Sequence, residues 1–290
     1  MSKRILVTGA NGQLGQELQV LASSYPDLVF DFVTRKSFDL EQDELMLAYL
    51  DQTPPDYIIN CAAYTAVDKA ESEPEQAKQI NQLAVATLAK WSAQHQVKLL
   101  HISTDYVFDG KSEIPYLEND NTNPQSVYGR TKHAGEEAAI AACPEIIIIR
   151  TAWVYSAFGS NFVKTMLRLM QERDSLNIVN DQIGSPTYAR DLAEVILKII
   201  ASAHWKPGIY HYSNCGRISW FEFAQAIKEL AGLTCDLNGI PTKAYPTPAQ
   251  RPAYSLLNTD KIMNTYGFAI PDYKASLKGC LAQLNALLPD

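Results

Sequence analysis

The sequence has 290 residues, 47% of them hydrophobic and 20% charged, which is typical of a globular protein with one large or two small domains. Its formal net charge of −7 argues against a nucleic-acid partner, because such proteins normally carry a basic surface. The five cysteines include no CxxC pair, so we expect no metal site. No apolar run is long enough for a signal peptide or a membrane span, so we expect a cytoplasmic protein with no membrane partner.

Short apolar segments alternate with helical patterns through the first half of the chain. We expect strands at 5–7, 28–33, 57–59, 98–102 and 146–149, and helices at 13–24, 41–51, 75–96 and from 126 to just before Pro144. Strands that alternate with helices predict an α/β fold with a doubly wound parallel sheet. Such a sheet binds ligands outside the carboxyl ends of its strands.

The pattern becomes looser after residue 150. Helices are expected at 160–173, 190–203, 219–231 and 273–287, separated by segments that carry Pro and Gly. We therefore divide the chain into a first domain, 1–150, and a smaller lobe, 151–290, with some segments of the lobe returning to the first domain.

A glycine-rich turn lies between the first expected strand and the first expected helix. Gly9, Gly12 and Gly15 are spaced by three, with Asn11, Gln13 and Leu14 between them. Glycines allow the backbone to approach a pyrophosphate closely, and the helix N-terminus favours its negative charge. The turn therefore predicts a dinucleotide site, the alternative being a turn whose glycines serve only helix packing.

Arg35 follows the second expected strand, 20 residues beyond Gly15. An acidic residue at such a position would bind the ribose hydroxyls of NAD, whereas an arginine suits the 2′-phosphate of NADP. Arg35 therefore favours NADPH and leaves NADH open. The alternative is a solvated basic pair with Lys36.

Tyr128 and Lys132 are four residues apart on an expected helix, so their side chains share a face. Hydride attack on a ketone places negative charge on its oxygen, which needs a hydrogen bond and a proton. We expect Tyr128 to be the proton donor, Lys132 to lower its pKa, and Thr104, at the end of the fourth strand, to donate a second hydrogen bond. The alternative is an ordinary amphipathic pair.

The glycine turn, Ser103-Thr104 and the Tyr128-xxx-Lys132 pair resemble the extended short-chain dehydrogenase/reductase superfamily, whose nucleotide-binding domain is a Rossmann fold. Finer motifs are similar to the dTDP-4-dehydrorhamnose reductase family and cover nearly the whole chain. They are 65–71, 103–110, 127–132, 150–155, 161–167, 180–187 and 245–252. The resemblance implies reduction of the 4-keto group of dTDP-4-dehydro-L-rhamnose with NAD(P)H, with residues 1–150 binding the cofactor.

The same resemblance assigns site residues. Those expected at the cofactor are Gly9, Asn11, Gly12, Gln13, Leu14, Arg35, Asp39, Leu40, Cys61, Ala62, Ala63, Tyr64, Tyr128 and Lys132. Those expected at the sugar nucleotide are Thr65, Thr104, Val107, Phe108, Tyr128, Trp153, Asn161, Lys164 and Arg251. Arg251, held between prolines, is the first candidate for the substrate pyrophosphate, ahead of Lys164 and Lys69. The alternatives are a core role for Trp153 and solvated surface positions for the cations.

The sequence departs from the resemblance at one point. Some members form dimers bridged by a divalent cation that glutamates hold, and Glu17 matches one such position. Arg190 stands where another acidic residue would be expected. We therefore expect Glu17 to be an exposed helix carboxylate and disfavour a metal-bridged dimer, while Mg²⁺ and a homodimer are both left open.

Two rival functions remain at this point. A 4,6-dehydratase or 4-epimerase would share the fold, but Thr104 is followed by Asp105-Tyr106 rather than by the Asp-Glu pair common in dehydratases. The second rival is a non-catalytic NADP-binding subunit like the regulatory subunit of methionine adenosyltransferase. The presence of Thr104, Tyr128 and Lys132 together favours catalysis.

Overall fold

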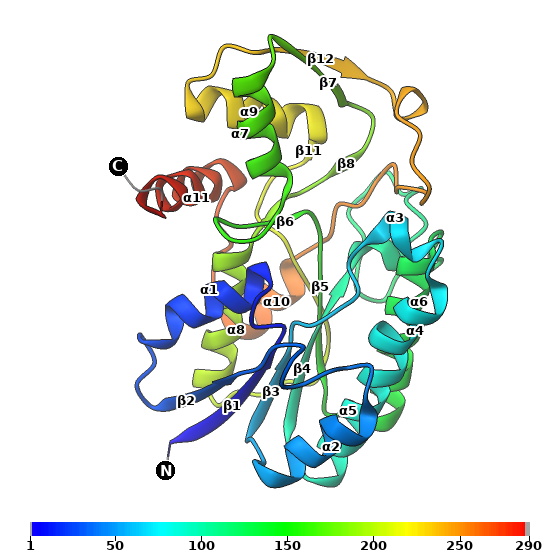
Figure 1. Ribbon diagram of the computed structural model, residues 1–290, viewed down its shortest axis with the longest axis vertical. Helices are drawn as coiled ribbons and strands as arrows, with labels where there is room; N and C mark the ends of the chain where they lie inside the picture. Colours follow the sequence, from blue (N-terminus) through cyan, green and yellow to red (C-terminus); the bar gives the residue numbers. More distant parts are fainter. Residues whose placement is uncertain (1, 288–290) are drawn as a thin grey trace.

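The computed structural model describes residues 2–287 and is built on one central sheet (Figure 1). Six parallel strands lie in the order β10-β5-β4-β3-β1-β2. They are β1 (Lys3–Thr8), β2 (Leu28–Phe32), β3 (Tyr57–Asn60), β4 (Lys98–Thr104), β5 (Ile147–Thr151) and β10 (Gly208–Tyr212). The strand order reverses at β1, which confirms the predicted doubly wound sheet and places a ligand crevice beside β1 and β3.

Helices cover both faces of this sheet (Figure 1). One layer contains α1 (Gln13–Ala22), α8 (Ala189–Ala201) and α10 (Asp260–Tyr266); the other contains α2 (Asp43–Gln52), α5 (Ala84–Gln94) and α6 (Val127–Ala142). Neighbouring side chains of a strand point to opposite faces, so Ile5 and Val7 pack in the first layer and Leu6 in the second. The strands are therefore apolar on both faces, as expected for a covered parallel sheet.

The helix expected at 75–96 contains a break. The chain forms α3 (Val67–Ala70), α4 (Pro74–Lys78), a π-helical turn at Gln79–Leu83, and then α5. Within that turn Asn81 is fully buried, and its amide bonds to the backbone of Tyr64 and to the Thr131 hydroxyl. These contacts account for a local departure from the regular helix that hydrophobic spacing does not reveal.

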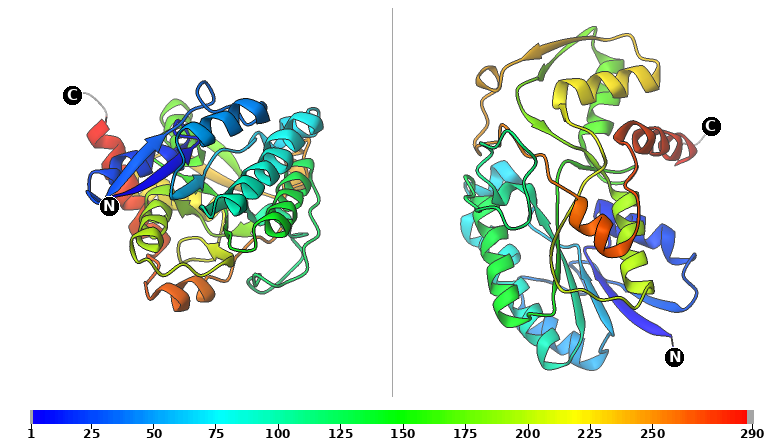
Figure 2. Two further views of the ribbon diagram at one scale, coloured as in Figure 1. Left: turned by 90° about the horizontal axis from the view of Figure 1, so that it is seen from below. Right: turned by 180° about the vertical axis from the view of Figure 1, so that it is seen from behind.

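The second lobe packs three helices against short strand pairs (Figure 2). Its elements are α7 (Phe162–Glu172), α9 (Trp220–Ala231), α11 (Tyr273–Leu287), β6 (Val154–Tyr155) with β9 (Thr187–Tyr188), β7 (Ser175–Val179) with β12 (Asp236–Ile240), and β8 (Ile183–Gly184) with β11 (Ile218–Ser219). Short 3₁₀ turns lie at Asp105–Val107 and Thr242–Ala244. The four helices expected after residue 150 are confirmed, with ends within two residues of those predicted.

The chain returns to the sheet after α8. β10 pairs in parallel with β5, with Gly208 opposite Ile147, and α10 packs beside β10. Neither element was expected. β10 reads Gly-Ile-Tyr-His-Tyr and lacks the apolar run that marks the other covered strands. No helix in residues 2–287 is long and apolar enough to cross a membrane.

Candidate active site

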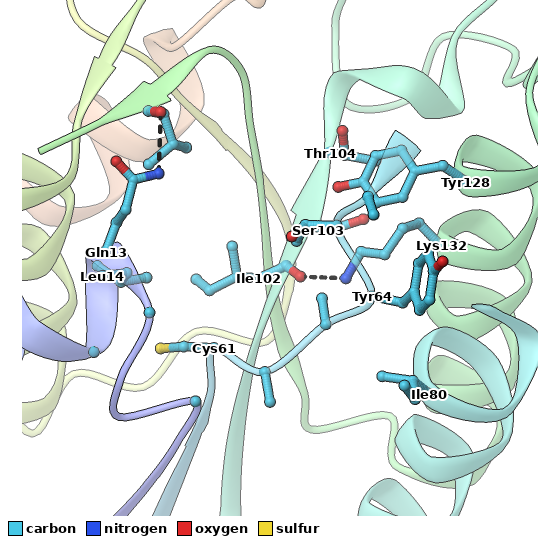
Figure 3. A pocket seen from close by; sticks show the side chains of 18 of the residues that line it. Gln13, Leu14, Cys61, Tyr64, Ile80, Ile102, Ser103, Thr104, Tyr128 and Lys132 are labelled. Carbon is cyan, nitrogen blue, oxygen red and sulfur yellow. Dashed lines mark hydrogen bonds between the residues drawn. The ribbon is translucent and has the colours of Figure 1, made fainter. Parts of the chain in front are cut away.

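A cavity of about 870 Å³ opens at the carboxyl ends of the sheet strands, where the strand order reverses. Figure 3 shows the glycine turn and Gln13 on one side of it, with Tyr128 and Lys132 of α6 on the other. Cys61, which follows β3, and Ile102, within β4, lie between them. The cavity therefore joins the predicted cofactor turn to the predicted proton donor.

The glycine turn is shaped so that side chains would not fit. Gly9 has a φ of +68°, and a Cβ on it would lie 2.8 Å from the Ala62 amide nitrogen. A Cβ on Gly15 would lie 2.4 Å from the Gly9 carbonyl oxygen. Gly12 immediately precedes α1, so the helix N-terminus opens directly onto the turn. These features fit a dinucleotide pyrophosphate, which binds close to backbone amides at a helix N-terminus.

Arg35 lies at the cavity wall with its side chain 68% exposed. Its guanidinium pairs with Glu41 and lies 3.7 Å from an oxygen of Asp39. Asp39 and Leu40 also line the cavity. Because two carboxylates face this guanidinium, the local charge is less positive than the sequence alone suggests, although the arginine stays available to solvent.

The segment after β3 forms the next part of the wall. Cys61, Ala62, Ala63 and Tyr64 all line the cavity. Asn81 of the π-helical turn fixes this segment, because its side chain accepts a hydrogen bond from the Tyr64 amide at 2.9 Å and donates to the Tyr64 carbonyl at 3.1 Å. A buried side chain therefore holds the backbone of a loop that faces the cofactor site.

Tyr128 lies in the first turn of α6, which begins where the Ser126 hydroxyl accepts a hydrogen bond from the Gly129 amide. Its ring packs edge-to-face against Tyr106, with centroids 5.5 Å apart. Desolvation raises the pKa of the Tyr128 phenol to about 12, and Asp105 adds to the rise, whereas a hydrogen bond with Thr104 opposes it. Tyr128 is therefore a protonated phenol at neutral pH.

Lys132 is buried one turn further along α6. Its Nζ donates to the Ile102 carbonyl at 2.6 Å and lies 3.1 Å from Nε2 of His101. Burial lowers the pKa of Lys132 to about 8. The expectation that Lys132 lowers the pKa of Tyr128 is not met in this structure, because the amine is directed toward β4 and desolvation dominates at the phenol.

Trp153 forms the wall on the side of the second lobe. Its backbone φ is +49°, which side chains rarely adopt. The indole stacks on Trp220 with centroids 3.7 Å apart, and Trp220 in turn packs against Phe162. The stack holds Trp153 as a flat aromatic surface facing the cavity.

Most predicted site residues share this one cavity. The members found in its wall are Gly9, Gly12, Gln13, Leu14, Arg35, Asp39, Leu40, Cys61, Ala62, Ala63, Tyr64, Thr65, Thr104, Tyr128, Lys132 and Trp153. Asn11 lies outside it, exposed at the tip of the turn.

Five other predicted residues also lie outside the cavity wall. Val107 and Phe108 are buried in a small apolar cluster. Asn161 caps α7 and donates to the Gln13 side chain at 2.9 Å, whereas Lys164 donates to the Ala157 carbonyl. Asn161 therefore supports a residue of the wall from behind.

Arg251 is engaged by a carboxylate. Its Nη2 donates to Asp68 at 2.6 Å, and the Ala249 amide donates to the other Asp68 oxygen at 3.1 Å. Its buried Nη1 bonds to no partner within residues 2–287. Arg251 therefore joins the 248–252 loop to α3 and keeps one free donor nitrogen.

Sequence reasoning missed several residues of the wall. Asp105 and Tyr106 also line the cavity. They directly follow Thr104 in the 103–110 motif, and this position next to a candidate catalytic residue could have indicated that they belong to the site. Ile80, Gly159 and Ser160 also line the cavity, but they reach it through the π-helical turn and a loop. No local pattern marks those three.

Glu17 corrects another expectation. It is 0% exposed, accepts a hydrogen bond from Ser156 at 2.6 Å, and lies 4.0 Å from Arg190. The prediction of an exposed helix carboxylate is wrong, because the second lobe covers this face of α1. Within residues 2–287 no cluster of three or more His, Cys, Asp or Glu side chains could hold a metal ion.

Comparisons with known proteins agree with this geometry. The sequence model of the RmlD substrate binding domain family matches residues 3–286. The dTDP-4-dehydrorhamnose reductase of Sinorhizobium fredii is 43% identical over 284 residues, 95% of each chain, and that of Salmonella typhimurium is 42% identical over 291 residues, 97% of each chain. The crystal structure of dTDP-4-dehydrorhamnose reductase from Bacillus anthracis in complex with NADP superposes with a TM-score of 0.93 at 37% identity, covering 98% of this chain and 100% of that chain. The chain therefore belongs to the dTDP-4-dehydrorhamnose reductase family.

Proposed function

We propose that this chain reduces the 4-keto group of dTDP-4-dehydro-L-rhamnose to dTDP-L-rhamnose, with NADPH as the favoured cofactor and NADH as an alternative. The observation that carries the proposal is the continuous cavity that links the glycine turn, Tyr128 and Trp153. A dinucleotide on the turn and a sugar against the indole would both reach Tyr128. The relatives named above supply the substrate class.

The reduced nicotinamide supplies the hydride that the keto carbon accepts. The protein must then stabilise and protonate the oxygen of that carbonyl group. Tyr128 holds its proton at neutral pH and is the proposed donor. The Thr104 hydroxyl donates to Asp105 at 3.1 Å in this structure; with the keto sugar bound, it would turn this proton to the same oxygen as a second hydrogen bond.

The two parts of the chain divide the remaining tasks in this proposal. Residues 1–150 hold the cofactor through the glycine turn, Arg35 and the segment after β3. Residues 151–290 mainly hold the sugar nucleotide, with Trp153 against the sugar. Arg251 is the proposed pyrophosphate ligand; because it lies outside the cavity wall and is held by Asp68 in this structure, it must turn towards the cavity to bind.

The metal-bridged dimer of some relatives is not part of this proposal. Glu17 is enclosed by Ser156 and Arg190, so it has no free oxygen facing solvent. If two copies associate, we infer that they do so without a bridging cation.

The deciding experiment supplies the 4-keto sugar from upstream enzymes and follows loss of reduced-nicotinamide absorbance with each cofactor. One cofactor oxidised per sugar reduced is the expected result. Cofactor that is bound but not consumed would instead favour an epimerase. Binding without any turnover would favour a regulatory subunit. Product identity, read by mass, separates these outcomes from background oxidation.

A further inference from the structure

The side chain of Gln13 leaves the glycine turn and reaches the second lobe (Figure 3). Gln13 is the first residue of α1, directly after Gly12, so its backbone belongs to the helix N-terminus that faces the cofactor site. Its side-chain amide instead contacts Val154 and Asn161, which lie 141 and 148 positions further along the chain. Among residues 2–287, both side-chain hydrogen bonds of Gln13 therefore connect the cofactor turn to the lobe that faces the sugar.

The donors and acceptors of these contacts fix the orientation of the Gln13 amide. Nδ2 of Asn161 donates to Oε1 of Gln13 at 2.9 Å, and Nε2 of Gln13 donates to the Val154 carbonyl at 3.3 Å. The Asn161 amide is itself oriented, because its Oδ1 accepts from the Lys164 backbone amide as the cap of α7. Turning the Gln13 amide over would place two NH₂ groups against each other and a carbonyl against a carbonyl. The observed orientation is therefore the one that satisfies both contacts.

Two further features bring the 154–161 segment close to α1. Glu17, one turn after Gln13, accepts a hydrogen bond from the Ser156 hydroxyl at 2.6 Å. Gly159 has a φ of +64°, and a Cβ on it would lie 3.0 Å from Cγ of Gln13. The segment therefore lies along one face of α1, and Gln13 is the residue of this contact that also lines the cavity.

The 154–161 segment begins where the chain crosses from the central sheet to the second lobe. β5 ends at Thr151 and β6 begins at Val154, so Trp153 lies at the crossing. The backbone of Trp153 has a φ of +49°, and its carbonyl accepts from the Thr187 amide at 3.2 Å. A side chain in this region of φ persists only where neighbouring contacts hold it. Thr187 supplies one such contact from the second lobe, and Gln13 holds the next residue, Val154, from the cofactor domain.

We propose that Gln13, although it belongs to the cofactor turn, is a positioning residue for the sugar nucleotide. Its amide holds the residue after Trp153 and thereby keeps the indole in place against the sugar. This inference rests on the proposed function, because it takes Trp153 to contact the sugar. The cofactor phosphates are served by the backbone amides at the helix N-terminus, which do not depend on the side chain at position 13.

A purely structural role for Gln13 predicts a different result. If the amide only stabilised the packing of α1 on the second lobe, its loss would lower the free energy of unfolding and leave the affinity for the sugar unchanged. The hydrogen bond between Glu17 and Ser156 does not involve Gln13. We therefore expect the two parts of the chain to stay packed when the Gln13 amide is removed.

The test compares Gln13→Met with the wild-type full-length enzyme. Methionine is similarly long and unbranched, but it forms neither amide hydrogen bond. We expect the KM for the 4-keto sugar, and the Kd for dTDP-L-rhamnose measured with NADP⁺ present, to rise about fivefold, the equivalent of one net hydrogen bond. The Kd for NADPH, measured by fluorescence, should change by less than about twofold, because the backbone of the turn is retained.

Gln16→Met is the matched control. Gln16 also lies in the first turn of α1, but its Nε2 donates to the Asn11 carbonyl of the glycine turn at 2.9 Å, not to the second lobe. Loss of this bond should leave the KM for the sugar within about twofold of the wild type, as expected for a side chain without contact to the 154–161 segment.

A second variant tests the same contact from the second lobe. Asn161→Asp keeps an oxygen that can cap α7 but has no proton to donate to Gln13. We expect the KM for the sugar to rise in this variant as well. The factor of this rise should be at least about threefold smaller in a Gln13→Met background, because the two residues share one hydrogen bond.

Three results would overturn the inference. One is an unchanged KM and Kd for the sugar nucleotides in a folded Gln13→Met enzyme; if that variant does not fold, an unchanged KM in Asn161→Asp decides instead. Another is an equal rise in Gln16→Met. The third is a pair of Gln13 and Asn161 effects that multiply independently. All three are read against an active wild-type enzyme, whereas a wild-type chain that neither binds dTDP-L-rhamnose nor reduces the keto sugar would refute the proposed function itself.

Discussion

Tyr128→Phe removes one oxygen atom from the proposed proton donor and leaves the rest of the site in place. The ring keeps its edge-to-face contact with Tyr106, and the hydrogen bond with Thr104 is the lost interaction. One such bond contributes about 1 kcal/mol to stability, so the variant should fold and bind NADPH almost normally.

The effect on turnover should be far larger. A positioned general acid contributes about 10²- to 10⁴-fold, which is about 2.7–5.4 kcal/mol of barrier at about 1.36 kcal/mol per tenfold. Thr104 and the cavity walls remain, so a residual rate is expected. The assay is single-turnover loss of reduced-nicotinamide absorbance, with cofactor affinity measured separately by fluorescence.

Tyr155→Phe is the control for this substitution. Tyr155 is equally aromatic and fully buried in the second lobe, and its hydroxyl has no hydrogen-bond partner among residues 2–287. Its loss should leave turnover unchanged and stability equal or slightly higher, because an unpaired buried hydroxyl is unfavourable. A Tyr128→Phe enzyme that turns over within a few-fold of wild type would refute the assignment of the proton donor.

Three other predictions concern cofactor choice, pH and metal. Arg35→Ala should lower the affinity for NADPH by about tenfold, the equivalent of one charge-assisted contact, and the affinity for NADH by less than about twofold. As a control, Lys36→Ala should change both affinities little and equally. Equal losses of NADPH and NADH affinity in Arg35→Ala would show that Arg35 does not recognise the 2′-phosphate. Burial raises the folded-state pKa of Asp105 from 3.8 to about 6. The protonated carboxyl therefore favours the folded state fully below about pH 4, and this contribution to stability is lost as the pH rises through 6. Asp105→Asn should therefore raise the free energy of unfolding in urea by about 1–3 kcal/mol at pH 8 and by little at pH 4; a gain independent of pH would contradict this. Chelator treatment should change neither activity nor molecular mass, because Glu17 is enclosed; dissociation of a dimer on chelation would show a bridging cation.

The parts of the site that follow from the sequence are those in which a local backbone or helix rule fixes the geometry. Gly9 and Gly15 mark the turn because no side chain fits there. Tyr128 and Lys132 share a helix face through their spacing, although spacing could not show that the lysine amine is directed to Ile102 rather than to the phenol.

The remaining parts depend on contacts between distant segments. Glu17 meets Ser156 across 139 positions of the chain, so nothing near it in sequence indicates burial. Asn81 similarly fixes Tyr64 through a π-helical turn that interrupts an otherwise regular helical pattern. Such residues become recognisable only when the fold brings their partners together.

The position of β10 has a consequence for biosynthesis of the chain. This strand pairs along one side of β5, and α8, which precedes it, covers that end of the apolar sheet. A nascent chain that has emerged only as far as β5 therefore presents unpaired backbone groups and bare aliphatic side chains, the combination that favours edge-to-edge aggregation. A fragment cut at residue 150 would carry the same liability permanently, so expression of the first domain alone should demand chaperones or yield inclusion bodies.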